Sequence, residues 1–183
     1  ACGDIGDLHR GSVVHRELSR MNLLKDVFVG SAVVDMYAKC GMLIETIEVF
    51  ESLSARNVIT WNALISGFAR LGKAKEVFDL FECMDIEGVK PDQATFSSIL
   101  KACSHGGDIE NGHTYFKAMD KSYGITPGLN HHTCMVDLFG RASLMQEAQD
   151  CIDTMPVIPN VVIWETLVNA LRAECNKNTA TTC

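Results

Sequence analysis

The 183-residue sequence is poor in proline, has no long apolar run and carries no excess of positive charge. With only 4 prolines and no low-complexity segment, the sequence predicts no extended disordered region away from its ends. No apolar stretch approaches the roughly 20 residues that a membrane-spanning helix needs, so we expect no membrane association. The formal net charge of −7 excludes indiscriminate binding to polyanions, and a nucleic-acid-binding surface would have to gather positive charge locally.

Signatures of catalysis and of metal binding are missing as well. The 8 cysteines form no C-x-x-C pair and no regular metal spacing, so we expect reduced thiols. Residues 15–17 (His-Arg-Glu) have the H-x-E form of zinc deaminases, but the P-C-x-x-C that completes such a site is absent. Residues 131–134 (His-His-Thr-Cys) are of ligand type, but adjacent side chains at a helix start diverge. Since a glycine-rich phosphate loop and an activated serine are also lacking, the sequence predicts no metal, no cofactor and no enzyme.

The sequence does contain an internal repeat. Four 23-residue blocks align without gaps at 31–53, 62–84, 97–119 and 133–155. Each block has apolar residues at its third, fourth and seventh positions, which lie on one face of a helix, and a second apolar stripe follows. The eleventh position is occupied by Gly41, Gly72, Gly107 and Ser143. Glycine there is typical of a left-handed helix cap, whereas the serine implies a weaker cap or a different turn, so each block predicts a helix–turn–helix hairpin.

Fragments of further units flank the four blocks. ACGDIGDLHRG at 1–11 matches ACSHGGDIENG at 102–112, and VVIWETLVNALR at 161–172 matches VITWNALISGFAR at 58–70. The chain is therefore predicted to start inside one repeat and to begin another near its end. Because single hairpins of this kind cannot bury both apolar faces, we expect them to stack into an all-α solenoid.

These stretches resemble pentatricopeptide repeats, and the resemblance extends to about Arg172. VITWNALISGFARLGKAKEVFDLFECMDIEGVKPD (58–92) is similar to the standard-length unit, down to its terminal PD. DVFVGSAVVDMYAKCG, ILKACSHGG and HHTCMVDLFGRA are characteristic of the plant subclass that mixes short, standard and long units, whose members mostly act in organellar RNA editing.

The fold implied by this resemblance is a right-handed superhelix of helix–turn–helix repeats. Its predicted units are a partial long-type repeat (1–26), a short-type repeat (27–57), a standard repeat (58–92), a long-type repeat (93–128), a late short-type repeat (129–160) and the start of a further helical unit (161–172). The remaining residues, 173–183, match nothing in the family, and we expect a polar, disordered tail.

The resemblance also implies that each unit reads one RNA base through two side chains, the fifth and the last residue of the unit. The pairs are Ser31 with Asn57, Asn62 with Asp92, and Thr133 with Asn160, while the long unit offers Ser97 opposite Gly128. A hydroxyl or amide would meet the Watson–Crick edge of a base, and the last residue would separate the base types. Since Gly128 has no side chain, the implied preference is A-U-n-A.

Two further sets of residues complete the implied RNA contacts. Three residues before the first reader, the family uses an apolar side chain to sandwich the base; Phe28 and Ile59 qualify, Ala94 barely does and Asn130 does not. Eight residues beyond the first readers stand Lys39, Arg70, His105 and Arg141. One cation per unit could contact successive phosphates, although solvated helix ends that favour the helix dipole are the alternative interpretation.

The sequence thus predicts the RNA-recognition part of an organellar editing or processing factor, located in the mitochondrion or chloroplast by resemblance alone. Its expected partners are single-stranded RNA and accessory editing proteins. No targeting segment can be read in this sequence, and a complete editing factor would continue into extension motifs and often a deaminase domain, so we expect recognition without modification. The alternative is a peptide-binding scaffold of the tetratricopeptide kind, whose W-x-x-L-G spacing and fixed 34-residue period are absent.

Overall fold

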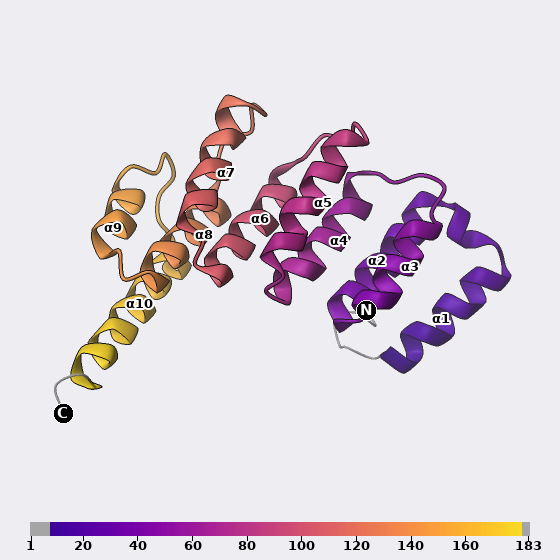
Figure 1. Cartoon of the computed structure of the whole chain (residues 1–183), viewed down its shortest axis with the longest axis horizontal. Helices are drawn as coiled ribbons and strands as arrows, with labels where there is room; N and C mark the ends of the chain where they lie inside the picture. The colour runs from indigo at the N-terminus through magenta and orange to yellow at the C-terminus, as the bar shows by residue number, and fades with distance from the viewer. Residues whose placement is uncertain (1–7, 181–183) are drawn as a thin grey trace. The chain divides into compact units, whose positions relative to one another are not determined.

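A computed structural model describes the backbone of residues 8–180 and the side chains of residues 10–173, and every regular element in that range is helical (Figure 1). The elements are α1 (Leu8–Arg20), the 3-10 helix η1 (Leu23–Lys25), α2 (Val27–Cys40), α3 (Leu43–Ser52), α4 (Val58–Arg70), α5 (Ala74–Ile86), α6 (Gln93–Gly106), α7 (Ile109–Lys121), α8 (Leu129–Arg141), α9 (Met145–Asp153) and α10 (Val161–Ala180). The predicted all-α fold is confirmed. None of the helices in the described range is both long and apolar enough to span a bilayer.

The first helix of each hairpin begins at the first residue of a predicted unit. These first residues are Val27, Val58, Gln93, Leu129 and Val161. Side chains placed just before the helices satisfy their free amides: Asp26 accepts from the backbone of Phe28 and Val29, and Asn57 accepts from that of Thr60. The predicted boundaries before residues 27 and 58 thus coincide with helix starts that carry a side-chain cap. Of the partial unit expected at 1–26, residues 1–7 lie outside the described range.

The turn inside each hairpin uses a residue with positive φ. Gly41, Gly72 and Gly107 have φ of 77°, 69° and 66°, as the cap pattern predicts. Ser143 adopts the same conformation, with φ of 60°, so the fourth hairpin has the same left-handed turn rather than a different one. The left-handed region is less favourable for serine, and the fourth hairpin therefore holds a locally strained residue.

The chain folds as two compact units, residues 1–98 and 99–183, with the boundary inside α6. In the first unit the predicted stripes form the core, and Val34, Ile65 and Met84 are 0% exposed. The ring of Phe50 on α3 packs edge-on against Trp61 on α4, with centroids 4.8 Å apart. A Cβ on Gly67 would lie 2.8 Å from that of Ala38, so α2 and α4 approach too closely there for a larger residue.

The second unit repeats this packing with α7 to α10. Val136 and Ala148 are fully buried, and the first helices α8 and α10 touch where Gly140 faces Ala170. The last helix, α10, continues to Ala180. The disordered tail expected from residue 173 is therefore wrong as far as Ala180, because the segment that follows Arg172 has no proline or glycine to end the helix.

Candidate nucleic-acid interface

The predicted reader pair Asn62 and Asp92 is brought together by the fold. Asn62 lies in the second turn of α4, and Asp92 immediately precedes α6. Asn62 Nδ2 donates to Asp92 Oδ1 over 2.9 Å, and the hydroxyl of Thr95, in the first turn of α6, donates to Asn62 Oδ1 over 2.6 Å. The backbone amide of Asp92 donates in turn to Thr95 Oγ1 over 3.1 Å, so the three residues form a closed ring of hydrogen bonds.

This ring determines which polar atoms of the pair remain open. Asp92 Oδ1 also accepts from the backbone amides of Ala94 and Thr95 at 2.9 Å and 3.0 Å, so the carboxylate is fixed as the cap of α6. Within the described residues, Asp92 Oδ2 and the second amide hydrogen of Asn62 have no bonding partner. Both side chains are half-buried. The pair therefore presents one donor and one acceptor side by side.

The pair Ser31 and Asn57 is joined in a different way. Ser31 is 3% exposed, and its hydroxyl lies 2.6 Å from both the carbonyl oxygen of Val27 and Thr60 Oγ1. Thr60 Oγ1 is in turn 3.0 Å from Asn57 Oδ1, which also accepts from the backbone amide of Thr60. The Ser31 hydroxyl is thus held inside the protein rather than open to a base, and Asn57 keeps only its amide nitrogen for an outside partner.

Sequence reasoning missed Thr60 and Thr95, although a local signal was present. Each threonine stands three residues after the capping residue, in N-V-I-T (57–60) and D-Q-A-T (92–95). This is the spacing of a reciprocal helix cap, in which the third residue returns a bond to the backbone of the first. The amides of Asn57 and Asp92 do donate to the two hydroxyls, at 3.4 Å and 3.1 Å.

The third pair, Thr133 and Asn160, is not joined by any such bridge. The Thr133 hydroxyl donates to the carbonyl of Leu129 in its own helix over 2.9 Å, and the exposed Asn160 accepts from the amide of Ile163 over 3.2 Å. Ile163 occupies the place of the two threonines, is 0% exposed and has no hydroxyl. In the described structure no hydrogen bond links the two readers of this unit.

The long unit differs again. The Ser97 hydroxyl donates to the carbonyl of Gln93 one turn earlier, over 2.9 Å, and the side chain is half-buried. His131 stands three residues after Gly128 and accepts from its amide through Nδ1 at 3.0 Å. The imidazole of this buried histidine thus replaces the threonine as the acceptor for the helix start.

The predicted sandwich residues lie on the surface. Phe28 is 68% exposed and Ile59 is 53% exposed, each in the first turn of a first helix. Ala94 and Asn130, at the same position in later units, are exposed too. An exposed Phe or Ile is open to a flat apolar ligand such as a base.

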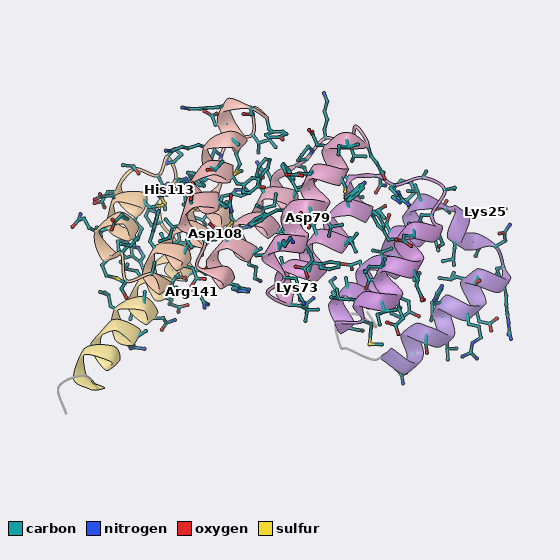
Figure 2. All side chains as sticks on the ribbon, viewed as in Figure 1. Lys25, Lys73, Asp79, Asp108, His113 and Arg141 are labelled. Carbon is teal, nitrogen blue, oxygen red and sulfur yellow. The ribbon has the colours of Figure 1, made fainter. Side chains whose placement is uncertain are left out.

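The four predicted cations differ in how free they are. Lys39 pairs with Asp35 at 2.9 Å, and Arg141, in the last turn of α8, pairs with Asp137 at 2.9 Å (Figure 2). Arg70 donates to the carbonyl of Lys39 over 3.3 Å, and His105 is exposed. Lys39 and Arg141 are therefore already opposed by a carboxylate one turn earlier in the same helix.

No group of three or more His, Cys, Asp or Glu side chains in the described residues is placed to hold a metal ion. His15 Nδ1 instead lies 3.0 Å from the hydroxyl of Tyr37. His132 is 6% exposed, with Nδ1 3.7 Å from the thiol of Cys151. Burial lowers the pKa of His132, and it raises the pKa of Cys151 to about 11, so both groups are neutral near neutral pH.

Comparison with known sequences places these repeats in a family. A model of the PPR (pentatricopeptide) repeat family matches residues 56–105, and a PPR repeat model matches residues 31–58 and 94–123. One pentatricopeptide repeat-containing protein of Arabidopsis thaliana is 44% identical over 180 residues, which are 98% of this chain and 24% of the relative. Another is 40% identical over 176 residues, which are 96% of this chain and 28% of the relative. The chain thus spans about a quarter of the length of these relatives.

Solved structures show the same fold. PPR10 from maize, in complex with an 18-nucleotide psaJ RNA element, superposes with a TM-score of 0.78 at 17% identity, covering 92% of this chain and 25% of that one. The PPR domain of Arabidopsis thaliana protein-only RNase P 1, in complex with tRNA, gives a TM-score of 0.63 at 21% identity, covering 81% of this chain and 82% of that one. From its sequence matches and its helical hairpins, the chain belongs to the pentatricopeptide repeat family.

Proposed function

We propose that this chain binds single-stranded RNA and reads it one base per repeat, as the recognition part of an organellar RNA editing or processing factor. The observation that carries the proposal is the meeting of Asn62 and Asp92, two residues that lie 30 positions apart and leave one donor and one acceptor open. Two solved relatives of the same fold are in complex with RNA, which supports the ligand class.

The open atoms of the second pair match uracil. Uracil presents a donor, N3–H, beside an acceptor, O4. Asp92 Oδ2 would accept from N3–H, and the free amide hydrogen of Asn62 would donate to O4. At the first pair, the amide nitrogen of Asn57 would donate to N1 of adenine, and the buried Ser31 contributes its small size rather than a bond. Exposed Phe28 and Ile59 would pack against the bases, which fits the preference A-U-n-A.

The backbone of the RNA would meet the exposed ends of the first helices. Arg70 offers positive charge and His105 an exposed imidazole to phosphates, and Lys39 and Arg141 offer positive charge once they exchange their carboxylate partners for phosphate. The role in editing and the mitochondrial or chloroplast location rest on the resemblance to the mixed-length subclass. A deaminase activity would be supplied by another domain or protein.

A second candidate function is the docking of an accessory protein. In the unit formed by residues 99–183, a groove of about 410 Å³ lies among α7, α8 and α9, with Phe116, Met135 and Phe139 in its lining. An apolar groove between helices suits an apolar side chain of a partner. The lining of this groove includes none of the predicted readers, so RNA reading and protein docking could occur together.

Titration against three ligands tests the RNA proposal. The ligands are a short RNA containing AUNA, a scrambled RNA and the DNA of matching sequence, each measured over a range of salt. We expect the first to bind most tightly, with log affinity falling against log salt by about 0.7 for each phosphate contacted. Equal affinity for all three ligands would contradict the proposal.

A further inference from the structure

We propose that Thr60 and Thr95 are positioning residues, which set how sharply the preceding pair of readers discriminates between bases. Neither was among the predicted readers, and each belongs to the unit after the pair that it contacts. Their proposed effect rests on the function proposed above, because it is exerted through Asn57 in one case and through Asn62 and Asp92 in the other.

The bonding capacity of a hydroxyl explains the effect at the second pair. Thr95 has one proton and two possible side-chain acceptors, Asn62 Oδ1 at 2.6 Å and Asp92 Oδ1 at 3.1 Å, and the shorter contact assigns the proton to Asn62. Because its oxygen also accepts from the amide of Asp92, that proton is directed away from the backbone. Asn62 must then place its carbonyl toward Thr95 and its nitrogen toward Asp92. The free hydrogen of Asn62 consequently points in one fixed direction, and a base that offers an acceptor there is favoured over one that offers a donor.

Thr60 has the same arrangement at the first pair. Its oxygen lies 2.6 Å from the Ser31 hydroxyl and 3.0 Å from Asn57 Oδ1. Within the described residues, the two readers of this pair share no direct hydrogen bond, so Thr60 is the group that links them. Its contact with Oδ1 leaves the amide nitrogen of Asn57 as the open end of that side chain.

The side-chain half of each helix cap does not depend on these hydroxyls, whereas the returning bond from the amide of Asn57 or Asp92 does. Asp92 Oδ1 holds the amides of Ala94 and Thr95 directly, and Asn57 Oδ1 holds the amide of Thr60. A variant that loses only the hydroxyl therefore keeps the side-chain cap of the helix. The effect on discrimination can for this reason be measured apart from the effect on folding.

The test measures the affinity of the protein for AUNA RNA and for the same RNA with cytosine at the second base. Thr95→Val removes the hydroxyl and keeps the shape, and we expect the uracil-to-cytosine ratio to fall about three- to tenfold, the value of one hydrogen bond. Thr95→Ser keeps the hydroxyl and should preserve the ratio. The matched control is Thr46→Val, since Thr46 is also 0% exposed but its hydroxyl, among the described residues, bonds only to the carbonyl of Met42, four residues earlier.

A double-mutant cycle separates positioning from a general loss of structure. In an Asn62→Ala background, Thr95→Val should change the base ratio no further, because its effect passes through Asn62. Circular dichroism checks that each variant is folded, and Thr95→Ala takes the place of Thr95→Val if the valine is not accommodated.

The outcomes of this experiment are distinguishable. If the parent protein binds both RNAs equally, the proposed function itself fails. If the parent discriminates and Thr95→Val weakens both RNAs by the same factor, or matches Thr46→Val, base readout stands and the positioning role is overturned. A lowered ratio that serine restores and that vanishes without Asn62 supports the role.

Discussion

Asn62 donates from Nδ2 to Oδ1 of Asp92 over 2.9 Å, although one residue lies within a helix and the other ends the linker of the same unit. A side chain that caps α6 is thereby also in contact with α4, the first helix of its own unit. Because the cap fixes one carboxylate oxygen, the other is left at the surface of the pair. This geometry gives Asp92 a structural role beside its proposed role in recognition.

Replacing Asp92 with asparagine should move the preference at the second base from uracil toward cytosine. The substitution exchanges a carboxylate, which can only accept, for an amide that can also donate, and donation suits N3 of cytosine. Asparagine caps helices as well as aspartate does, so the fold should be retained. The expected change in the uracil-to-cytosine affinity ratio is about tenfold, within the 1–3 kcal/mol that one good pair of hydrogen bonds contributes to base discrimination.

Asp108→Asn provides the matched control for that experiment. Asp108, labelled in Figure 2, caps α7 by accepting from the amide of Asn111 over 3.0 Å, and it is not one of the predicted readers. The Asp108→Asn variant therefore shows how an aspartate-to-asparagine change at a helix cap affects RNA binding when no reader is altered. An Asp92→Asn protein with the base ratio of the Asp108→Asn protein would contradict readout by Asp92.

Removing the carboxylate of Asp35 should strengthen RNA binding. Asp35→Asn removes the 2.9 Å ion pair with Lys39, so contact with phosphate no longer costs the lysine that pair. An exposed pair of this kind is worth about 0.3–0.5 kcal/mol, which predicts roughly a twofold gain in affinity and a steeper dependence on salt.

The control for Asp35→Asn is Asp79→Asn, because Asp79 is exposed on α5 and forms no ion pair in the described structure (Figure 2). Both variants change the net charge equally. If both give the same gain and the same salt slope, only the overall charge matters, and Lys39 has no special contact with RNA.

Truncating Phe28 should weaken binding to every RNA sequence. The ring is 68% exposed, so Phe28→Ala should leave the stability of the fold almost unchanged. Loss of a stacked base costs about 1–3 kcal/mol, and we expect at least a fivefold loss of affinity for AUNA and scrambled RNA alike. Ile86→Ala, at an 84% exposed position on α5, is the control and should bind as the parent does. Equal affinities of the two variants would exclude a sandwich role for Phe28.

The sequence predicts the fold well because the signals are local. Apolar stripes with helical spacing and a glycine after each first helix determine the hairpins, and the buried Val34 and Ile65 are members of those stripes. Two deviations are also physical. Ser143 takes a glycine-like φ because the hairpin requires that turn, and α10 extends past Arg172 because no residue there ends it.

The candidate site was less accessible to sequence reasoning. The readers came from family resemblance, and the burial of Ser31 beneath Thr60 depends on how two helices pack, which no local pattern reveals. The ion pair of Lys39 with Asp35 follows from their four-residue spacing, which is visible in the sequence, but the row of cations taken alone does not reveal it. The positive charge that such a row offers to RNA depends on whether a carboxylate lies one helical turn away from each basic residue.

Replacing His132 with phenylalanine should stabilise the protein, most of all in acid. His132 stands where other first helices carry Trp61, Phe96 and Trp164, and its Nε2 is buried without a hydrogen-bond partner. Burial, followed by the charge of His131, lowers the pKa of His132 below 6.5. The unfolded chain therefore binds a proton that the folded protein does not, and stability falls as pH drops below about 6.5.

His132→Phe removes both the unsatisfied nitrogen and this proton linkage. We expect a gain of about 1 kcal/mol at neutral pH, from the buried polar atom, and a larger gain at about pH 5, from the linkage. Urea unfolding of the parent and the variant at both pH values measures the two gains, and the exposed His105, changed to asparagine, is the control for loss of an imidazole. An equal gain at both pH values would show that His132 is not the group whose protonation destabilises the fold. A loss of stability at neutral pH would mean that the 3.7 Å contact of His132 with Cys151 stabilises the fold more than the burial of Nε2 destabilises it.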